Sequence, residues 1–212
     1  MSSDDWYRRT TWTETDRSEF QARLKRSRGD YHKAQYLRIQ AHHLAAAKQT
    51  LAAIELLDQL FADFPHESQL ASARLQYAEC MLALDRLDDA IASYRLAFAA
   101  EQAYPNSRSQ LWLDYPWLLV TRGISQHYDE IDTYLEWGER KTTFPVEEFR
   151  LQTILSFRAD DSGDSNAATA HAQVALAAAA KQHSGFVPHP TVGLVGNPEP
   201  TVLDRLQRLA GV

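Results

Sequence analysis

The sequence is short of the residues that usually build disulfides, catalytic loops and membrane spans. Its one cysteine, Cys80, cannot form an internal disulfide and has no second thiol for a metal cluster, so we expect a core position and a reducing compartment. Eight glycines and eight prolines in 212 residues leave few of the turns on which catalytic loops are built. No apolar run approaches the roughly 18 residues of a membrane span. These shortages predict a soluble protein that is not an enzyme.

Acidic residues outnumber basic ones. The chain has 28 acidic and 22 basic residues, a net charge of -6, so the whole molecule should repel nucleic acid and anionic lipid. Residues 1–33 are more basic, but acidic residues are interleaved and no aromatic set alternates with the bases, which disfavours a nucleic-acid contact. The acidic start has no apolar stretch behind it, so we expect no secretory signal. We predict a cytoplasmic protein with no membrane partner.

An aromatic residue followed by proline recurs at Phe64-Pro65, Tyr104-Pro105 and Phe144-Pro145, each 40 residues from the next. Proline cannot continue a helix and restricts the residue before it, so each pair is interpreted as the end of one helical unit. Between the first two pairs, apolar residues recur at helical spacing in two stretches that meet near Asp85-Arg86. The predicted unit is therefore a helical hairpin.

Small or branched residues align in the second helices of four such units. They are Ala53-Ile54, Ala90-Ile91, Ile131 and Ala168, separated by 37, 41 and 37 residues. Two helices approach to about 8 Å only where the side chains between them are short. Hairpins of this kind must stack to bury their apolar faces, and four exceed the roughly three needed for a stable array.

This pattern resembles the tetratricopeptide-repeat family, a 34-residue helix-turn-helix with small residues at the helix contact and a Gly-Asp turn. The fourth unit carries that turn at Gly163-Asp164, followed by Ala168 and Ala175. The resemblance spans roughly residues 34 to 182 and implies an all-α, right-handed α-solenoid of four hairpins. The other matching residues are Ala41, Leu44, Ala53, Ile54 and Leu57, then Tyr77, Ala78, Met81, Ala90, Ile91, Tyr94 and Ala97, then Ile131 and Leu135. The third unit departs most from the family pattern, with Gly138 at its second small position.

We expect one domain, 1–212, with about nine to ten helices. Residues 1–33 are predicted to form an arm and a capping helix, with Asp16 and Glu19 near its start. Residues 183–212 are predicted to form an extended cover, anchored by Phe186, and a C-terminal helix. The opening Asp5-Trp6-Tyr7-Arg8 and the closing His183-Ser184-Gly185-Phe186 also resemble a group of bacterial proteins.

Several clusters that could carry chemistry have plainer interpretations. The eight histidines lack the spaced Cys or second-turn His partners of a metal site, so no metal or other cofactor is predicted. The turn Asp160-Asp161-Ser162-Gly163-Asp164 lacks the span and closing Glu of a calcium loop. Glu147 and Glu148 follow Pro145 in a helix first turn, where carboxylates act as caps rather than as catalytic acids and bases.

Residues 104–158 differ in composition from the rest of the chain, because they contain no alanine and hold 10 of its 22 aromatic residues. Core packing is favoured for most of these aromatic side chains, and an aromatic groove for a ligand peptide is the alternative. Pro116 lies inside the helical run from Leu111 to Val120 and should kink or restart that helix. The aromatic residues in question are Trp112, Tyr115, Trp117, Tyr128, Tyr134, Trp137 and Phe149.

The resemblance implies a protein–protein interaction scaffold, because first helices of such arrays line a concave groove that binds a peptide segment or partner protein. Chaperone-binding members grip a C-terminal carboxylate with Lys, Asn and Arg side chains that are missing here, so we expect an internal segment or a folded partner. The implied groove has arginines around an apolar centre. Its positions are Gln35, Arg38 and His42, then Gln76 and Glu79, then Leu113 and Trp117, then Arg150, Thr153 and Arg158.

Two other functions stay open from the sequence. An aromatic third unit beside a kinked helix could enclose a pocket for a small molecule or a reaction. The acidic, compact, single-chain character also fits an immunity-type inhibitor of a toxin. Neither the identity of the partner nor the oligomeric state follows from the sequence.

Overall fold

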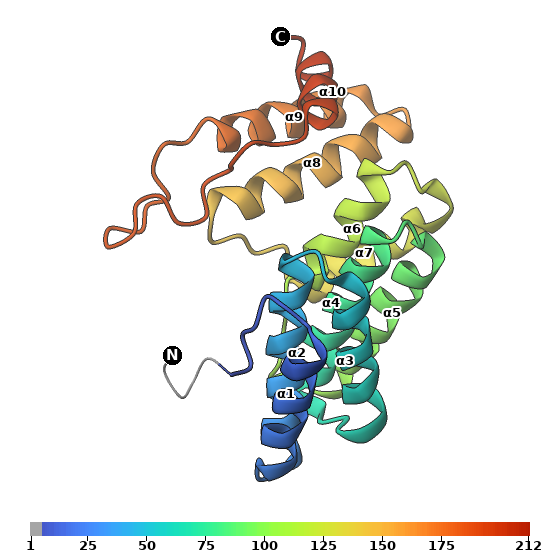
Figure 1. Ribbon diagram of the computed structural model, residues 1–212. Coiled ribbons are helices and arrows are strands. Elements are labelled where there is room, and N and C mark those ends of the chain that lie inside the picture. Colours follow the sequence, from blue (N-terminus) through green and yellow to red (C-terminus); the bar gives the residue numbers. More distant parts are fainter. Residues whose placement is uncertain (1–5) are drawn as a thin grey trace. The chain divides into compact units, whose positions relative to one another are not determined.

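The protein is all-helical in the computed structural model, which describes residues 6–212 (Figure 1). Across these residues there are ten α-helices, one 3-10 helix and no strand. The chain divides into two compact units, Met1–Leu111 and Trp112–Val212. Each unit is described by itself below.

The first unit is built from two helix pairs and a preceding helix. Helix α2 packs against α3, α4 packs against α5, and both α2 and α3 contact α4. Cys80 lies in this core as predicted, and burial raises the pKa of its thiol to about 11. The bounds are α1 Glu14–Arg26, α2 Asp30–Ala46, α3 Thr50–Asp63, α4 Glu67–Ala83 and α5 Leu87–Ala103.

The second unit has one long helix pair, two shorter helices and a C-terminal helix. Helices α8 and α9 form the pair, and α10 packs against both of them. Helix α6 continues through Pro116, so the predicted restart is not observed. The bounds are α6 Leu111–Thr121, the 3-10 helix η1 Ser125–Glu130, α7 Ile131–Trp137, α8 Pro145–Asp161, α9 Ser165–Ala179 and α10 Pro200–Ala210.

The same turn follows α2, α4, α6 and α8. Its last residue has a left-handed backbone at Lys48, Asp85, Gly123 and Gly163, which are 37, 38 and 40 residues apart. In each turn the next amide donates to the carbonyl five residues earlier, as Gln49 does to Leu44 at 2.8 Å. This is the Schellman arrangement, which satisfies carbonyls that the helix end would leave unpaired. The turns recur more regularly than the side chains do.

Two of these turns carry a strained residue, which gives a stability prediction. Lys48 has φ 63°, a conformation that costs a side chain about 1 kcal/mol and costs glycine almost nothing. We expect Lys48→Gly to raise the free energy of unfolding by roughly 0.5–1 kcal/mol in urea denaturation. Gly163→Ala, at φ 83° in the equivalent turn, should lower it by a similar amount. If Lys48→Gly lowered the free energy of unfolding, the left-handed backbone at Lys48 would be contradicted.

Short side chains at the contact let the paired helices approach closely. Ala53, Ala90, Ile131 and Ala168, which the repeat aligns, are all fully buried. The approach is close enough for side chains to reach the neighbouring backbone: the Ser156 hydroxyl on α8 donates to the Ala168 carbonyl on α9 at 2.8 Å. Ser93 on α5 makes the same kind of bond to the α4 backbone, also at 2.8 Å. Adjacent helices therefore pack as pairs, as predicted.

Enlarging the small residue at this contact should be costly. Ala90→Leu places three extra carbon atoms where α4 and α5 meet, so we expect it to lower the free energy of unfolding by about 1–3 kcal/mol. Ala92→Leu is the matched control, because Ala92 lies on the same helix and is exposed. Equal stability of the two variants in urea denaturation would mean that Ala90 does not face α4.

The stretch from α6 through η1 to α7 differs from the regular helix pairs, because aromatic side chains take the place of alanine there. The six residues of η1 precede α7, so Ile131 comes eight residues after its left-handed turn residue, whereas Ala168 comes five residues after Gly163. Gly138 ends α7 against the Trp112 ring, where a Cβ would lie 2.2 Å from a ring carbon. A glycine therefore makes room for the tryptophan.

The aromatic–proline pairs have two different roles. Phe64 and Tyr104 end α3 and α5, as predicted. Pro145 instead begins α8, so the third pair marks a helix start, and the prediction that it ends a unit is wrong. Proline suits the first position of a helix because no hydrogen bond is required of its nitrogen there. The Glu147 carboxylate accepts from the Thr143 amide at 2.7 Å, which agrees with its predicted capping role.

The C-terminal cover is formed by α10 rather than by the segment before it. Arg205 on α10 forms ion pairs with Asp160 at 2.6 Å and with Asp161 at 2.5 Å. These two aspartates are the last residues of α8, so the ion pairs join α10 to the end of α8. Phe186 meets the Phe144 ring edge to face at 6.4 Å but is 51% exposed, so it is not the buried anchor that the sequence predicted. Gly193 makes a closer contact: its carbonyl accepts from the Val146 amide at 2.9 Å, and its Cα lies against Phe144.

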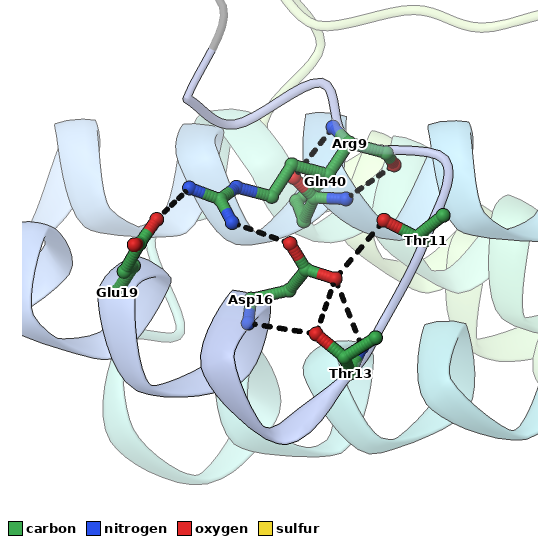
Figure 2. A network of polar contacts seen from close by, with 6 residues as sticks. All are labelled: Arg9, Thr11, Thr13, Asp16, Glu19 and Gln40. Atoms are coloured by element: carbon green, nitrogen blue, oxygen red, sulfur yellow. Dashed lines mark hydrogen bonds and ion pairs between the residues drawn. The ribbon is translucent and has the colours of Figure 1, made fainter.

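A polar network holds the N-terminal arm on α1 and α2 (Figure 2). The buried Gln40 amide accepts from the Arg9 amide at 3.0 Å and donates to the Arg9 carbonyl at 2.7 Å. The Arg9 guanidinium bonds to Asp16 at 2.6 Å and to Glu19 at 2.5 Å. Asp16 also forms a capping box with Thr13, the residue that starts α1. The predicted capped helix is confirmed. Of the arm's opening residues, Asp5 lies outside the described range.

The capping box makes stability depend on pH. Hydrogen bonds from the Thr13 amide and hydroxyl lower the pKa of Asp16 to about 2 from an ordinary 3.8. The folded state thus favours the ionised carboxylate, so its stabilisation is present above about pH 4 and is lost as the pH falls towards 2. Asp16→Asn should cost about 1 kcal/mol at pH 7 and much less at pH 2.5, by urea denaturation. The exposed Asp129→Asn is the control. If Asp16→Asn lowered the free energy of unfolding equally at pH 7 and pH 2.5, the stabilising role of the ionised Asp16 in the capping box would be contradicted.

Candidate functional site

Five of the predicted groove residues lie on the adjacent helices α2 and α4 of the first unit. Gln35, Arg38 and His42 follow one another at helical spacing on α2, and Gln76 and Glu79 do so on α4. Arg38 bonds directly to Gln76, and His42 and Glu79 line one hollow between the helices. The Gln35 amide reaches only along its own helix, where it donates to a tyrosine hydroxyl. We call this surface the α2–α4 face.

Arg38 is the central residue of the α2–α4 face. Its Nε donates to Oε1 of Gln69 at 2.8 Å. With the Gln76 amide assigned so that its oxygen faces the guanidinium, which satisfies both groups, Nη1 donates to Oε1 of Gln76 at 3.2 Å and Nε2 of Gln76 donates to the Arg38 carbonyl at 3.2 Å. Gln69 and Gln76 are seven residues apart, two helical turns, so both point from the same side of α4. Burial lowers the pKa of the Arg38 guanidinium.

Open hollows lie at both ends of the α2–α4 face. The hollow near the C-terminal ends of the two helices has a volume of about 250 Å³ and includes His42, Glu79 and the buried Cys80 in its lining. The hollow near their N-terminal ends has a volume of about 570 Å³ and is lined by polar and aromatic side chains. Its residues are Tyr31, His66, Ser68, Gln69, Tyr104, Asn106 and Ser107. Arg38 lies on α2 between these two ends.

The other five predicted groove residues belong to the second unit, and two of them cannot reach a partner. Leu113 and Thr153 are both 0% exposed. Thr153 is also satisfied locally, since its hydroxyl donates to the Phe149 carbonyl at 2.7 Å. Their assignment to a groove surface is therefore wrong in this structure. Leu113 lies on the buried side of α6, and Thr153 lies on the buried side of α8, which packs against α9.

The two arginines predicted for the groove in the second unit already have carboxylate partners. Arg150 lies 2.7 Å from Asp114, and its guanidinium is 5.3 Å from the centre of the Trp117 ring. Burial raises the pKa of Asp114, although Arg150 opposes the shift. Arg158 lies 2.6 Å from Asp132. The charges of these two arginines are therefore compensated by aspartates within the second unit.

Of the seven aromatic side chains weighed between core and groove, four are buried in the core, which was the favoured interpretation. Trp112, Tyr115, Tyr134 and Phe149 are buried. The rings of Tyr115 and Tyr134 are 4.7 Å apart, and the Tyr115 hydroxyl donates to a glutamate at 3.1 Å. These four rings are therefore unavailable as the lining of a ligand groove.

Among residues 6–212, no three His, Cys, Asp or Glu side chains are grouped so that they could hold a metal ion. The adjacent rings of His42 and His43 meet edge to face at 5.6 Å, and burial is the main cause that lowers the pKa of His43. In the same described range, no helix is long and apolar enough to cross a membrane.

Sequence reasoning missed the residues that complete the α2–α4 face at its N-terminal end. Gln69 could have been found, because its spacing of seven from Gln76 places both on one helix side. Tyr104 and Ser107 had no such signal, since they follow α5 in an irregular loop. The Ser107 hydroxyl donates to the Ser68 carbonyl at 2.8 Å, and this bond ties the loop to α4.

Comparisons with models of protein families, with curated proteins and with solved structures found no match for this chain. The resemblance to tetratricopeptide repeats therefore stays a prediction from residue spacing.

Proposed function

We propose that the protein is an interaction scaffold whose α2–α4 face binds a segment of another protein. The observation that carries this proposal is Arg38, held by Gln69 and Gln76 between two open hollows. The face offers a fixed charge at its centre and concave surface on both sides. That combination suits a chain that lies along the two helices.

The recurring hairpin supports a tetratricopeptide-like α-solenoid as the architecture of the scaffold. Four left-handed turn residues at intervals of 37, 38 and 40 are what a repeated hairpin requires. In an array of this kind the first helices of successive pairs lie side by side, and α2 and α4 are in contact. The α2–α4 face would then be the inner surface of the first two repeats.

A protein segment fits this face better than a small molecule does. Small-molecule sites are usually concave pockets that bury most of the ligand. Both hollows here are open, and the glutamine-held arginine lies between them rather than inside either. An extended segment or a helix can use both hollows at once, whereas a compact ligand would contact only one.

A peptide display selection with the full-length chain tests this function. We expect the wild-type protein to select a recurring sequence from a random library. Ala46 is exposed and lines the smaller hollow, so Ala46→Trp should fill that hollow and weaken binding of the selected peptide about tenfold or more. Ala99→Trp is the matched control, because Ala99 is equally exposed on α5, outside the α2–α4 face.

Affinity would be measured by calorimetry with a synthetic peptide of the selected sequence. Failure to select any recurring sequence would contradict the function. Equal affinity of the Ala46→Trp and Ala99→Trp variants would place the binding surface elsewhere.

A further inference from the structure

Arg38 differs from the other two arginines predicted for the groove in how its charge is compensated. Arg150 and Arg158 each have an aspartate within 2.7 Å. Within the described residues 6–212, Arg38 makes no ion pair, and its side-chain partners are the neutral amides of Gln69 and Gln76. One cation is therefore held in place without a carboxylate.

The two glutamines fix the guanidinium plane and leave one of its three nitrogens, Nη2, unused. Nε is occupied by Gln69 and Nη1 by Gln76. Nη2 has no hydrogen-bond partner among the residues that the structure describes, although it carries two donor hydrogens. A guanidinium oriented in this way can donate from Nη2 to a carboxylate at little cost in side-chain entropy.

Partial burial makes such a partner favourable. The chain around Arg38 removes water that would otherwise solvate the charge, and amide oxygens compensate only part of that loss. A carboxylate arriving at Nη2 restores full compensation, and hydrogen bonds between charged groups are about twice as strong as neutral ones. The net charge of -6 disfavours strongly acidic partners at long range, so one or two acidic residues fit better than an acidic tract.

The neighbouring hollow has the chemistry to hold the residues beside such a carboxylate. Gln69 belongs both to the support of Arg38 and to the lining of the larger hollow. Tyr31 is exposed there, and its ring meets the His66 ring edge to face at 5.2 Å. Aromatic rings of this kind offer rigid contact area to the backbone and side chains of a bound segment.

Resting on the proposed function, we propose that Arg38 receives the side-chain carboxylate of an aspartate or glutamate at an internal position of the bound segment. Gln69 and Gln76 are positioning residues that hold the guanidinium for this contact. The tyrosine and histidine rings at the larger hollow contact the residues next to the acidic one.

The test uses the full-length chain and a random library in which each peptide is flanked by constant sequence, so that no free C-terminus is presented. We expect Asp or Glu to dominate one position of the selected sequence. Arg38→Gln should remove this preference, and Arg38→Lys should keep part of it. The exposed Arg28→Gln carries the same charge change in the same unit and should leave the selection unchanged.

A double-mutant cycle then isolates the contact. The selected peptide, with both ends blocked, is compared with a version in which its acidic residue is changed to the amide. For wild-type protein the amide peptide should bind about tenfold more weakly or worse, and for Arg38→Gln the two peptides should bind equally. Thermal unfolding of each variant shows that the fold is kept, and Gln69→Ala should reduce the acidic preference without removing it.

The outcomes separate this inference from the proposed function. If no recurring sequence is selected, the proposed function fails. If a sequence is selected without an acidic position, or if the cycle shows no coupling between Arg38 and the acidic residue, the inference fails while the function stands. Binding that needs a free C-terminal carboxylate would also overturn the inference.

Discussion

The close approach of two helices at alanine is the constraint on which most of this structure depends. Ala53, Ala90 and Ala168 are fully buried where the second helix of each pair meets the first. The approach lets serine hydroxyls reach the neighbouring backbone, as Ser156 does to the Ala168 carbonyl. A larger side chain would separate the helices and leave these bonds unmade. Each pair is therefore specified by a few small residues and by the turn between its helices.

Residues 104–158 contain no alanine, and the helices there pack differently. Without alanine, the helices near Trp112 and Tyr134 pack through rings, and space is made by Gly138. The second helix begins with a 3-10 turn, so the side-chain spacing drifts although the turn residues keep their interval. Local backbone geometry is thus repeated in a stretch where side-chain packing is not.

Much of the fold could be predicted from the sequence because alanine spacing and turn residues act locally. The helix pairs, the buried Ala90 and Cys80, and the Gly163-Asp164 turn all follow from neighbours along the chain. Phe144-Pro145 could not be interpreted alone, because proline is tolerated where a helix begins and also breaks one. The prediction that Phe186 is the anchor failed for another reason. Which residue holds a segment in place depends on contacts distant in sequence, here those of Gly193.

The candidate site was predicted correctly only in the first unit. Arg38, His42, Gln76 and Glu79 lie on the α2–α4 face because α2 and α4 belong to regular pairs. Leu113 on α6 and Thr153 on α8 are instead in the core of the second unit. The glutamine support of Arg38 depends on a pairing between two helices, which no spacing along one helix reveals.

Chemical-shift mapping by NMR tests the central claim, that the α2–α4 face binds a protein segment, most directly. The full-length chain would be titrated with a peptide selected from the library. We expect the largest shifts at Gln35, Arg38, His42, Gln76 and Glu79, with little change in α8, α9 and α10. Shifts concentrated in the second unit, or on α1 and α3 away from α4, would contradict it.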